Sequence, residues 1–144
     1  MATDRQRSII WHGMFLFLMG LLTGLAQQQV ANPRMGLAAH LEGLMNGTFL
    51  IALGAVWTHV RLSPRLSAGA YWSALYGAYA NWVTTLFAAA VGTKSMTLLS
   101  GAGYGGSPWQ EALVTAGFIT VGIAMLAASI IMLWGLRRAA PAAT

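Results

Sequence analysis

Five polar side chains stand inside long apolar stretches of this sequence, and their chemical types suit a reactive site. They are His12, His40, Glu42, Asn46 and Asn81. Polar groups inside a membrane span cost free energy, so they are functional candidates by default. An imidazole can bind a metal, a carboxylate can move a proton, and amides can orient a polar substrate through hydrogen bonds.

Three of these residues, His40, Glu42 and Asn46, fall within seven positions, which is too dense for a single helix contact. Glu42 and Asn46 are four residues apart and share one face of a helix. A rise of about 1.5 Å per residue places Asn46 and Asn81 at similar depth, and it separates His12 from His40 by roughly 20 Å. We therefore expect a site around His40, whereas His12 and Asn81 could also be simple interhelical hydrogen-bonding groups.

Four apolar stretches must position these residues, and three of them open with a capping residue followed by proline. These starts are Asn32-Pro33, Ser63-Pro64 and Ser107-Pro108, which is typical of a helix N-terminus. The sequence predicts an all-α fold, a four-transmembrane-helix bundle, in a single domain of residues 1–144. The predicted spans are about 9–27, 33–60, 66–92 and 108–136.

The composition indicates a lipid bilayer as the surroundings. Hydrophobic residues make up 57% of the chain and charged residues 8%, whereas an average soluble domain has roughly 25% charged residues. The net charge of +5 comes from basic residues scattered at the ends of apolar stretches, so we expect no nucleic-acid partner. The chain has no cysteine, which excludes disulfides, iron–sulfur clusters and covalently attached haem.

The basic residues also indicate the orientation of the chain. Four spans would place six arginines on one side and only Arg34 and Lys94 on the other. By the positive-inside rule we expect a multi-pass protein of the cytoplasmic membrane with both termini in the cytoplasm. The six residues are Arg5, Arg7, Arg61, Arg65, Arg137 and Arg138.

Glycines flank Asn46 in the predicted second span. Gly43 and Gly47 are four residues apart, and Gly20 and Gly24 repeat this spacing in the first span. Such spacing lets a neighbouring helix or a flat ligand come close to the backbone. Because four thin helices enclose little volume, the site could lie between subunits.

Four motifs contain most of these residues, and they carry a resemblance to a known family. The sequence resembles the hydroxylaminobenzene mutases, which are akin to the bacterial styrene oxide isomerases. The most specific motif is H-x-E-G-x-x-N-G, because such a polar string is rare inside a membrane helix. The motifs are Trp11-His12-Gly13-Met14, Ala31-Asn32-Pro33-Arg34-Met35-Gly36-Leu37, His40-Leu41-Glu42-Gly43-Leu44-Met45-Asn46-Gly47 and Tyr79-Ala80-Asn81-Trp82.

The resemblance implies a small membrane enzyme that forms a homotrimer and binds haem b between subunits, with the iron as a Lewis acid. It implies that His40 is the axial iron ligand and that Asn46 and Asn81 act in catalysis. Gly43 and Gly47 would lie at the cofactor. Glu42 would either shuttle a proton or fix the tautomer of His40.

Two departures from the epoxide isomerases favour the mutase branch. Those enzymes carry a small residue at the position of Glu42 and a tyrosine at the position of Thr85. We therefore predict a mutase that converts N-aryl hydroxylamines, which are small apolar aromatic substrates, into 2-aminophenols.

Three other functions stay open. The first is isomerisation of an aryl epoxide to an aldehyde with the same cofactor. The second is a haem-bearing electron-transfer subunit, which would usually need a second axial histidine. The third is a small transporter in which His40 and Glu42 relay protons.

Overall fold

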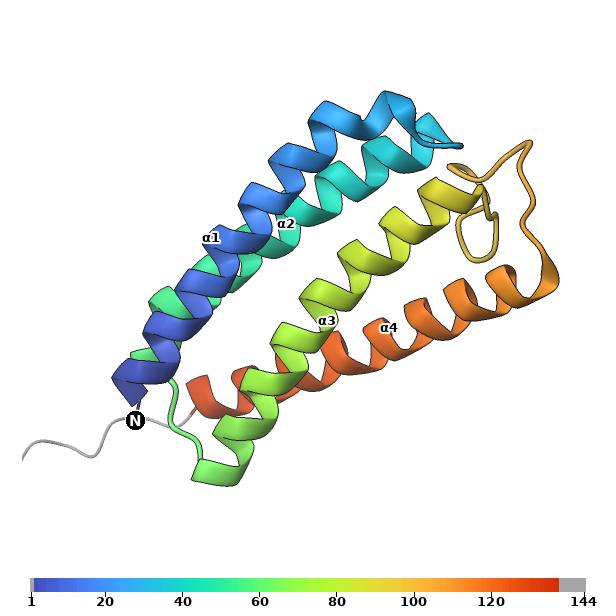
Figure 1. Ribbon diagram of the computed structural model, residues 1–144. Helices are drawn as coiled ribbons and strands as arrows, with labels where there is room; N and C mark the ends of the chain where they lie inside the picture. Colours follow the sequence, from blue (N-terminus) through green and yellow to red (C-terminus); the bar gives the residue numbers. More distant parts are fainter. Residues whose placement is uncertain (1, 138–144) are drawn as a thin grey trace, which may run out of the picture.

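The computed structural model describes residues 2–137, and this part of the chain forms four long helices (Figure 1). It contains no strand, so the all-α prediction is confirmed. Short 3-10 helices extend the first two long helices, and a loop of residues 92–107 precedes the last one. The elements are α1 (Ala2–Ala26), η1 (Gln27–Gln29), α2 (Pro33–Val56), η2 (Trp57–His59), α3 (Pro64–Val91) and α4 (Pro108–Leu136).

The three predicted cap-and-proline starts are confirmed. Proline occupies the first position of α2, α3 and α4, after a capping residue in extended conformation. At the start of α2 the Asn32 Oδ1 accepts the backbone N–H of Met35 at 3.2 Å. At the start of α4 the Gln110 Oε1 accepts the backbone N–H of Ser107 at 2.8 Å. Each bond satisfies a backbone donor that the helix itself leaves unpaired.

The first helix begins at Ala2, well before the apolar stretch that predicts it. Its polar first turns are hydrogen bonded to the start of α3. Arg5 Nη1 donates to Ser67 Oγ at 2.8 Å, and the hydroxyl groups of Ser8 and Tyr71 share a bond of 2.8 Å. These tertiary bonds extend the helix beyond the limit set by hydrophobicity.

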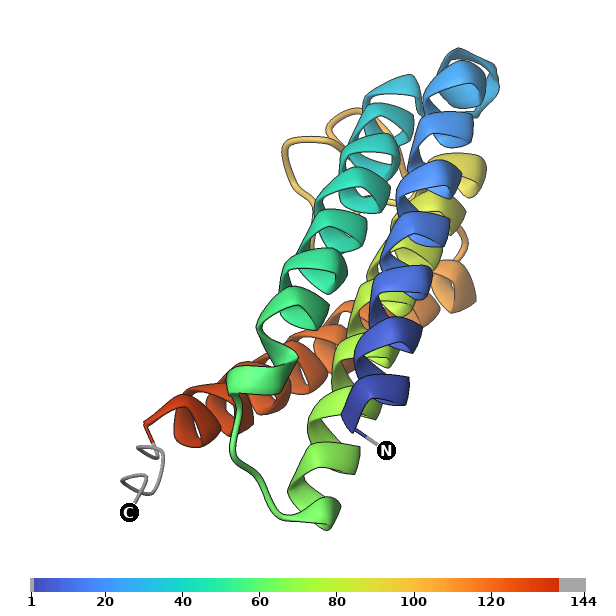
Figure 2. The same ribbon diagram turned by 90° about the vertical axis from the view of Figure 1, so that its left-hand side faces the viewer.

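The helices pack in the order α1, α2, α3, α4. Figures 1 and 2 show α1 alongside α2, and α4 crossing on the far side of α3. Among the described residues, α4 makes no extensive contact with α1 or α2. The buried alanines Ala70, Ala74 and Ala78 of α3 belong to the larger core cluster. The two central helices, α2 and α3, therefore carry the interfaces in which a site can form.

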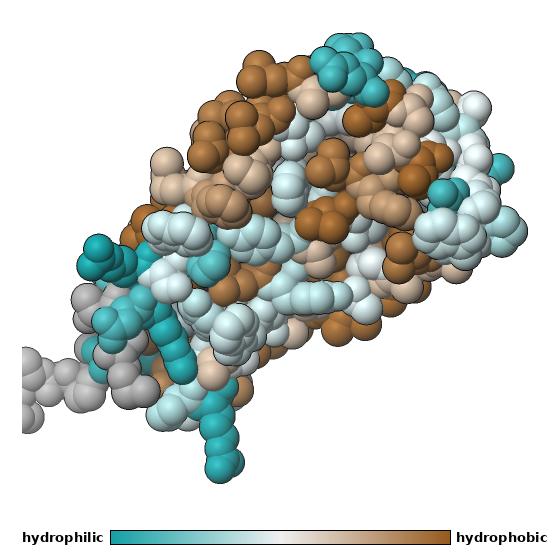
Figure 3. Space-filling model, viewed as in Figure 1, coloured by the Kyte–Doolittle hydropathy of each residue, from teal (hydrophilic) through white to brown (hydrophobic). Residues whose placement is uncertain are grey.

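Three helices are long and apolar enough to cross a membrane. The candidate spans are Asp4–Gln29, Pro33–His59 and Pro108–Leu136. The 28 residues of α3 give sufficient length, but this helix is less apolar because it carries tyrosine, tryptophan and Asn81. Since α3 lies between α2 and α4, neighbouring helices cover much of its surface. Figure 3 shows hydrophilic residues gathered near the ends of the helices and mostly hydrophobic or weakly polar residues between them. This is the distribution of a membrane protein.

The arginines predicted to share one side lie at one end of the helices. The start of α1, the segment between α2 and α3 and the end of α4 meet there (Figure 2), and Arg61 N–H donates to the Gly135 carbonyl at 3.1 Å. Arg34 and Lys94 belong to segments at the opposite end. Of the six arginines in this prediction, Arg138 lies outside the described residues.

Glycines let the backbones of α1 and α2 approach closely. A Cβ atom on Gly47 would lie 2.6 Å from Phe17 N and 2.8 Å from the Gly13 carbonyl oxygen. A Cβ atom on Gly20 would lie 2.7 Å from Leu44 N. All three obstacles are backbone atoms, so a side chain could be accommodated only by moving the helices apart.

We expect Gly47→Ala to lower the thermal unfolding temperature of the detergent-solubilised protein. Overpacking of this kind costs about 1–3 kcal/mol. The matched control is Gly122→Ala on α4, where an added Cβ meets nothing within 4 Å and alanine favours the helix. Equal unfolding temperatures for the two variants would contradict this account of the α1–α2 contact.

The carboxylate of Glu111 anchors the loop of residues 92–107 to the first turn of α4. It accepts the backbone N–H groups of Lys94 at 3.2 Å, Ser95 at 2.8 Å and Gly106 at 2.7 Å. Both ends of the loop are thus attached to one side chain. Without this carboxylate, three backbone donors would lose their partner.

The loop is also attached to the start of α2. Asn32 Nδ2 donates to the Ser100 carbonyl at 2.8 Å, and the Arg34 guanidinium donates to the Ala102 carbonyl. The Arg34 guanidinium also lies 5.8 Å from the centre of the Tyr104 ring. These contacts hold the loop over the α2 and α4 ends.

We expect Glu111→Ala to speed amide hydrogen exchange at Lys94, Ser95 and Gly106 by roughly tenfold, since each loses a charge-assisted hydrogen bond. Glu111→Gln keeps one acceptor oxygen and should give an intermediate rate. Unchanged exchange in the alanine variant would show that the loop is held by other contacts.

Candidate active site

The imidazole of His40 is held by a backbone carbonyl of α1. His40 Nδ1 lies 2.8 Å from the Gly20 carbonyl oxygen. A carbonyl only accepts hydrogen bonds, so Nδ1 carries the proton and Nε2 of the neutral ring keeps its lone pair. A metal-binding histidine needs this arrangement, in which one ring nitrogen is fixed and the other is free to bind.

Glycines of α1 make room for this ring. A Cβ atom on Gly24 would lie 2.6 Å from His40 Nδ1 and 2.8 Å from its Cε1. The predicted small-residue spacing of Gly20 and Gly24 therefore has two uses. Gly20 contributes its carbonyl oxygen and a close backbone approach, and Gly24 leaves space for the imidazole.

Glu42, Asn46 and Asn81 form a second polar group, between α2 and α3. Glu42 Oε2 accepts hydrogen bonds from Asn46 Nδ2 at 3.0 Å and from Asn81 Nδ2. Asn46 Nδ2 also donates to the backbone carbonyl of Glu42 at 2.9 Å. The expectation that Asn46 and Asn81 lie at similar depth is confirmed, because one carboxylate oxygen binds both amides.

The structure separates His40 from this group, although the sequence suggests a single cluster. His40 and Glu42 are two residues apart, so their side chains leave α2 at directions about 200° apart. His40 is directed to α1 and Glu42 to α3. The partner that fixes the His40 tautomer is thus the Gly20 carbonyl, and Glu42 does not have this role.

The two glycines predicted at the cofactor face α1. A Cβ atom on Gly43 would meet Gly20 and lie 3.2 Å from Trp82 Cδ1, and Gly47 abuts the backbone of Phe17. Of the two uses that their spacing allows, close approach of a helix is the one observed. Protein atoms fill the space in front of both glycines, and their place at the cofactor stays a prediction.

Trp82 and Thr23 join α3 to α1 close to the two polar groups, and neither is among the predicted site residues. Trp82 Nε1 donates to Thr23 Oγ1 at 3.1 Å, which joins α3 to α1. Thr23 precedes Gly24, which lies under the His40 ring, and Trp82 follows Asn81. The available signal was a tryptophan deep inside a predicted span, away from the interfaces where membrane tryptophans usually gather.

His12 has the simpler of its two expected roles. Its Nδ1 lies 3.0 Å from the Tyr79 hydroxyl, and that hydroxyl lies 3.3 Å from the His12 carbonyl oxygen. These bonds join α1 to α3. His12 therefore acts as an interhelical hydrogen-bonding group.

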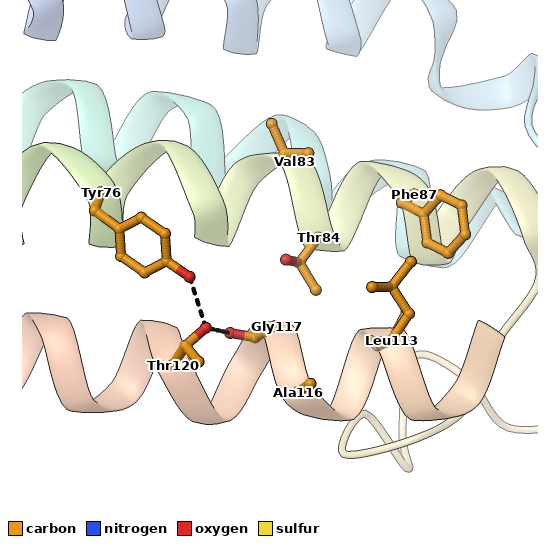
Figure 4. A pocket seen from close by; sticks show the side chains of 9 residues that line it. Tyr76, Val83, Thr84, Phe87, Leu113, Ala116, Gly117 and Thr120 are labelled. Atoms are coloured by element: carbon orange, nitrogen blue, oxygen red, sulfur yellow. Dashed lines mark hydrogen bonds between the residues drawn. The ribbon is translucent and has the colours of Figure 1, made fainter. Parts of the chain in front are cut away.

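A separate hollow of about 420 Å³ lies between α3 and α4 (Figure 4). It is mainly apolar, and the Tyr76 hydroxyl bonds to Thr120 Oγ1 at 2.8 Å along one side. Thr120 in turn donates to the Gly117 carbonyl at 2.9 Å. The hollow contains none of the predicted site residues, because Asn81 is directed to α2.

The donor set tests whether a haem fits. Within residues 2–137, no three histidine, cysteine, aspartate or glutamate side chains come together as a metal site. The chain instead offers one imidazole with a fixed tautomer and a free Nε2. A haem supplies four nitrogen ligands of its own and needs an axial protein ligand, so His40 fits this cofactor better than it fits a metal ion held by protein alone.

We expect Gly24→Ala to displace the His40 ring from the Gly20 carbonyl, since the new methyl group would overlap the imidazole. Nitrogen-15 NMR of histidine-labelled protein in detergent should show the loss of the Nδ1-protonated tautomer. Gly122→Ala is the control and should leave the ring nitrogen shifts unchanged. Identical shifts in Gly24→Ala and the unmodified protein would contradict the proposed packing of His40.

Comparison with known proteins gives the family. A family model described as styrene oxide isomerase matches residues 5–137. Hydroxylaminobenzene mutase HabB of Ectopseudomonas oleovorans is 43% identical over 135 residues, which cover 92% of this chain and 82% of that protein. Hydroxylaminobenzene mutase HabA of the same organism is 39% identical over 134 residues, covering 92% of this chain and 99% of that protein. No solved structure matches the chain.

These matches extend over nearly the whole described chain and include every residue of the two polar groups. The relatives are mutases and the family is one of isomerases, so the chain is an enzyme of this kind. It belongs to the styrene oxide isomerase family.

Proposed function

We propose that the chain is a membrane mutase that converts N-aryl hydroxylamines, such as hydroxylaminobenzene, into 2-aminophenols. The observation that carries this proposal is the similarity to two hydroxylaminobenzene mutases over 92% of the chain. The polar group of Glu42, Asn46 and Asn81 supports it, because the reaction moves protons and a hydroxyl group. Apolar aromatic substrates partition into lipid and can reach a site between membrane helices.

His40 would hold haem b through Nε2, and the Gly20 carbonyl would keep the proton on Nδ1. When bound, a ferric haem supplies a Lewis acid that polarises the N–O bond of the substrate. A single histidine of this chain would hold the cofactor. This distinguishes the proposal from the electron-transfer alternative, in which a second histidine is usual.

Glu42 is the residue of this site that would move a proton. Its Oε2 already accepts two amide hydrogen bonds, whereas its Oε1 has no partner among the described residues. Oε1 would give a proton to the hydroxyl oxygen of the substrate, so that the N–O bond breaks with its electron pair on oxygen and water leaves.

The positive charge left on the substrate spreads to the ortho carbon of the ring, where water adds. Glu42 Oε1 takes back a proton from the added water. The ring C–H proton then moves to nitrogen, which restores the aromatic ring and gives 2-aminophenol. No atom is gained or lost overall, and the carboxyl group returns to its starting state.

We also propose how the chain lies in the membrane. α3 would be the fourth span, since its 28 residues reach roughly 40 Å at the rise of an α-helix. Both termini would lie in the cytoplasm, at the arginine-rich end, in the cytoplasmic membrane. A homotrimer with haem between subunits, as the resemblance implies, would complete the site.

Purified protein should convert hydroxylaminobenzene to 2-aminophenol faster than it converts styrene oxide to an aldehyde. The family description supports styrene oxide as the second candidate substrate, and a preference for the epoxide would overturn the mutase assignment.

His40→Ala should abolish activity and the haem Soret absorption together. His59→Ala, at an exposed histidine in η2, is the control and should keep both. A colourless protein with full activity would refute the haem proposal.

A further inference from the structure

The hydrogen bonds of Glu42 determine which atoms of Asn46 remain for a ligand. A side-chain amide has two N–H donors and one carbonyl oxygen. Asn46 Nδ2 donates to the backbone carbonyl of Glu42 at 2.9 Å and to Glu42 Oε2 at 3.0 Å. Both donors are therefore used within one turn of α2, and Oδ1 is the only hydrogen-bonding atom of this side chain that is left.

This orientation of the amide is fixed by chemistry. The two atoms that face Asn46 Nδ2 are a backbone carbonyl oxygen and a carboxyl oxygen that also accepts from Asn81. A reversed amide would place its own oxygen against both acceptors, without any hydrogen between them. Asn46 is 6% exposed, and its Oδ1 is not among the fully buried polar atoms that lack a partner. A ligand can thus meet Asn46 only as an acceptor.

The Asn81 side chain keeps more of its hydrogen-bonding atoms for a ligand than Asn46 does. One of its N–H groups is used by Glu42 Oε2, so one donor and Oδ1 remain. Thr85 Oγ1 donates to the backbone carbonyl of Asn81 at 2.9 Å and leaves the side chain untouched. Together, the two amides present two acceptor oxygens and a single N–H to a ligand.

We infer that Glu42 is the residue that sets the substrate class, because it binds the amide donors and makes Asn46 an acceptor. A hydroxylamine has N–H and O–H groups that can donate to Asn46 Oδ1. An epoxide oxygen only accepts, so it finds no donor at Asn46 and, of the four N–H groups of the two amides, only the one left at Asn81. This inference rests on the proposed function in one respect, namely that these amides contact the substrate.

Removing the carboxylate should reverse this preference. In Glu42→Ala the Asn46 side chain loses one acceptor, and an N–H group becomes available to an epoxide oxygen. Leaving a buried polar group unpaired costs enough to change affinity roughly tenfold or more. Alanine also creates space, so Glu42→Leu is needed as a second variant that removes the acceptor but fills the volume.

Glu42→Gln is the matched control. Its amide oxygen can still accept from Asn46 and Asn81, but the side chain can no longer exchange a proton. We expect this variant to keep the binding preference of the unmodified protein while its kcat for hydroxylaminobenzene falls at nearly constant KM.

The experiment measures dissociation constants of the haem-loaded, detergent-purified proteins by isothermal titration calorimetry. The probes are styrene oxide, which only accepts hydrogen bonds, and aniline, which donates them. Glu42→Ala and Glu42→Leu should bind styrene oxide about tenfold more tightly, and aniline more weakly, than the unmodified protein and Glu42→Gln. Thermal unfolding of each variant checks that it is folded.

Equal affinity of all four proteins for styrene oxide would overturn the inference, even if the unmodified protein isomerises hydroxylaminobenzene. If the predicted order of affinities is found but the unmodified protein does not convert hydroxylaminobenzene, the inference stands and the proposed function fails. The two ideas are thus tested separately.

Discussion

The close backbone contact between α1 and α2 is the constraint on which the site depends. In a bilayer, lipid is as apolar as the helix surface, so helices associate through packing and hydrogen bonds and less through the hydrophobic effect. Gly20 and Gly24 lack the side chains that would otherwise keep α2 at a distance. Only at this distance can the Gly20 carbonyl reach His40 Nδ1 at 2.8 Å. The contact that joins the helices therefore also sets the tautomer of the neutral imidazole.

On the opposite side of α2, hydrogen bonds between polar side chains hold it to α3, whereas close packing at glycines holds it to α1. Each polar group at this depth must find a partner within the protein, because the surrounding lipid offers none. Glu42 satisfies this requirement by accepting from both Asn46 and Asn81. The same bonds leave defined atoms free, so one requirement explains both the stability of the α2–α3 contact and the chemistry available to a ligand.

Much of the fold could be predicted from the sequence, because helix starts and apolar length are local properties. The proline starts of α2, α3 and α4 are examples. The start of α1 was missed because it depends on tertiary bonds of Arg5 and Ser8 to another helix. Among the four helices, α3 does not reach the apolarity expected of a membrane span, and hydropathy takes no account of the neighbouring helices that pack against it.

The candidate site was predicted in its residues but only partly in its arrangement. The pairing of Glu42 with Asn46 follows from their spacing of four residues, and the meeting with Asn81 follows from equal depth. The partner of His40 could not be predicted in the same way, because a backbone carbonyl is present at every position and has no signature in the sequence. The separation of His40 from Glu42 could have been predicted from the sequence, since a spacing of two residues places side chains on different sides of a helix.

This separation limits how a ligand can use both groups. His40 and Glu42 differ by about 3 Å along the axis of α2 and by about 200° around it. α1 and α3 cover parts of the surface between them, and Trp82 Nε1 donates to Thr23 Oγ1 where these two helices meet. The two side chains leave α2 on different sides, so a small substrate would have to reach around this helix to contact both. A wide planar cofactor at His40, or a second copy of the chain that brings its own Glu42 group, would bring the two chemistries together. The proposed homotrimer is consistent with this separation, because a second copy of the chain could place its Glu42 group near His40.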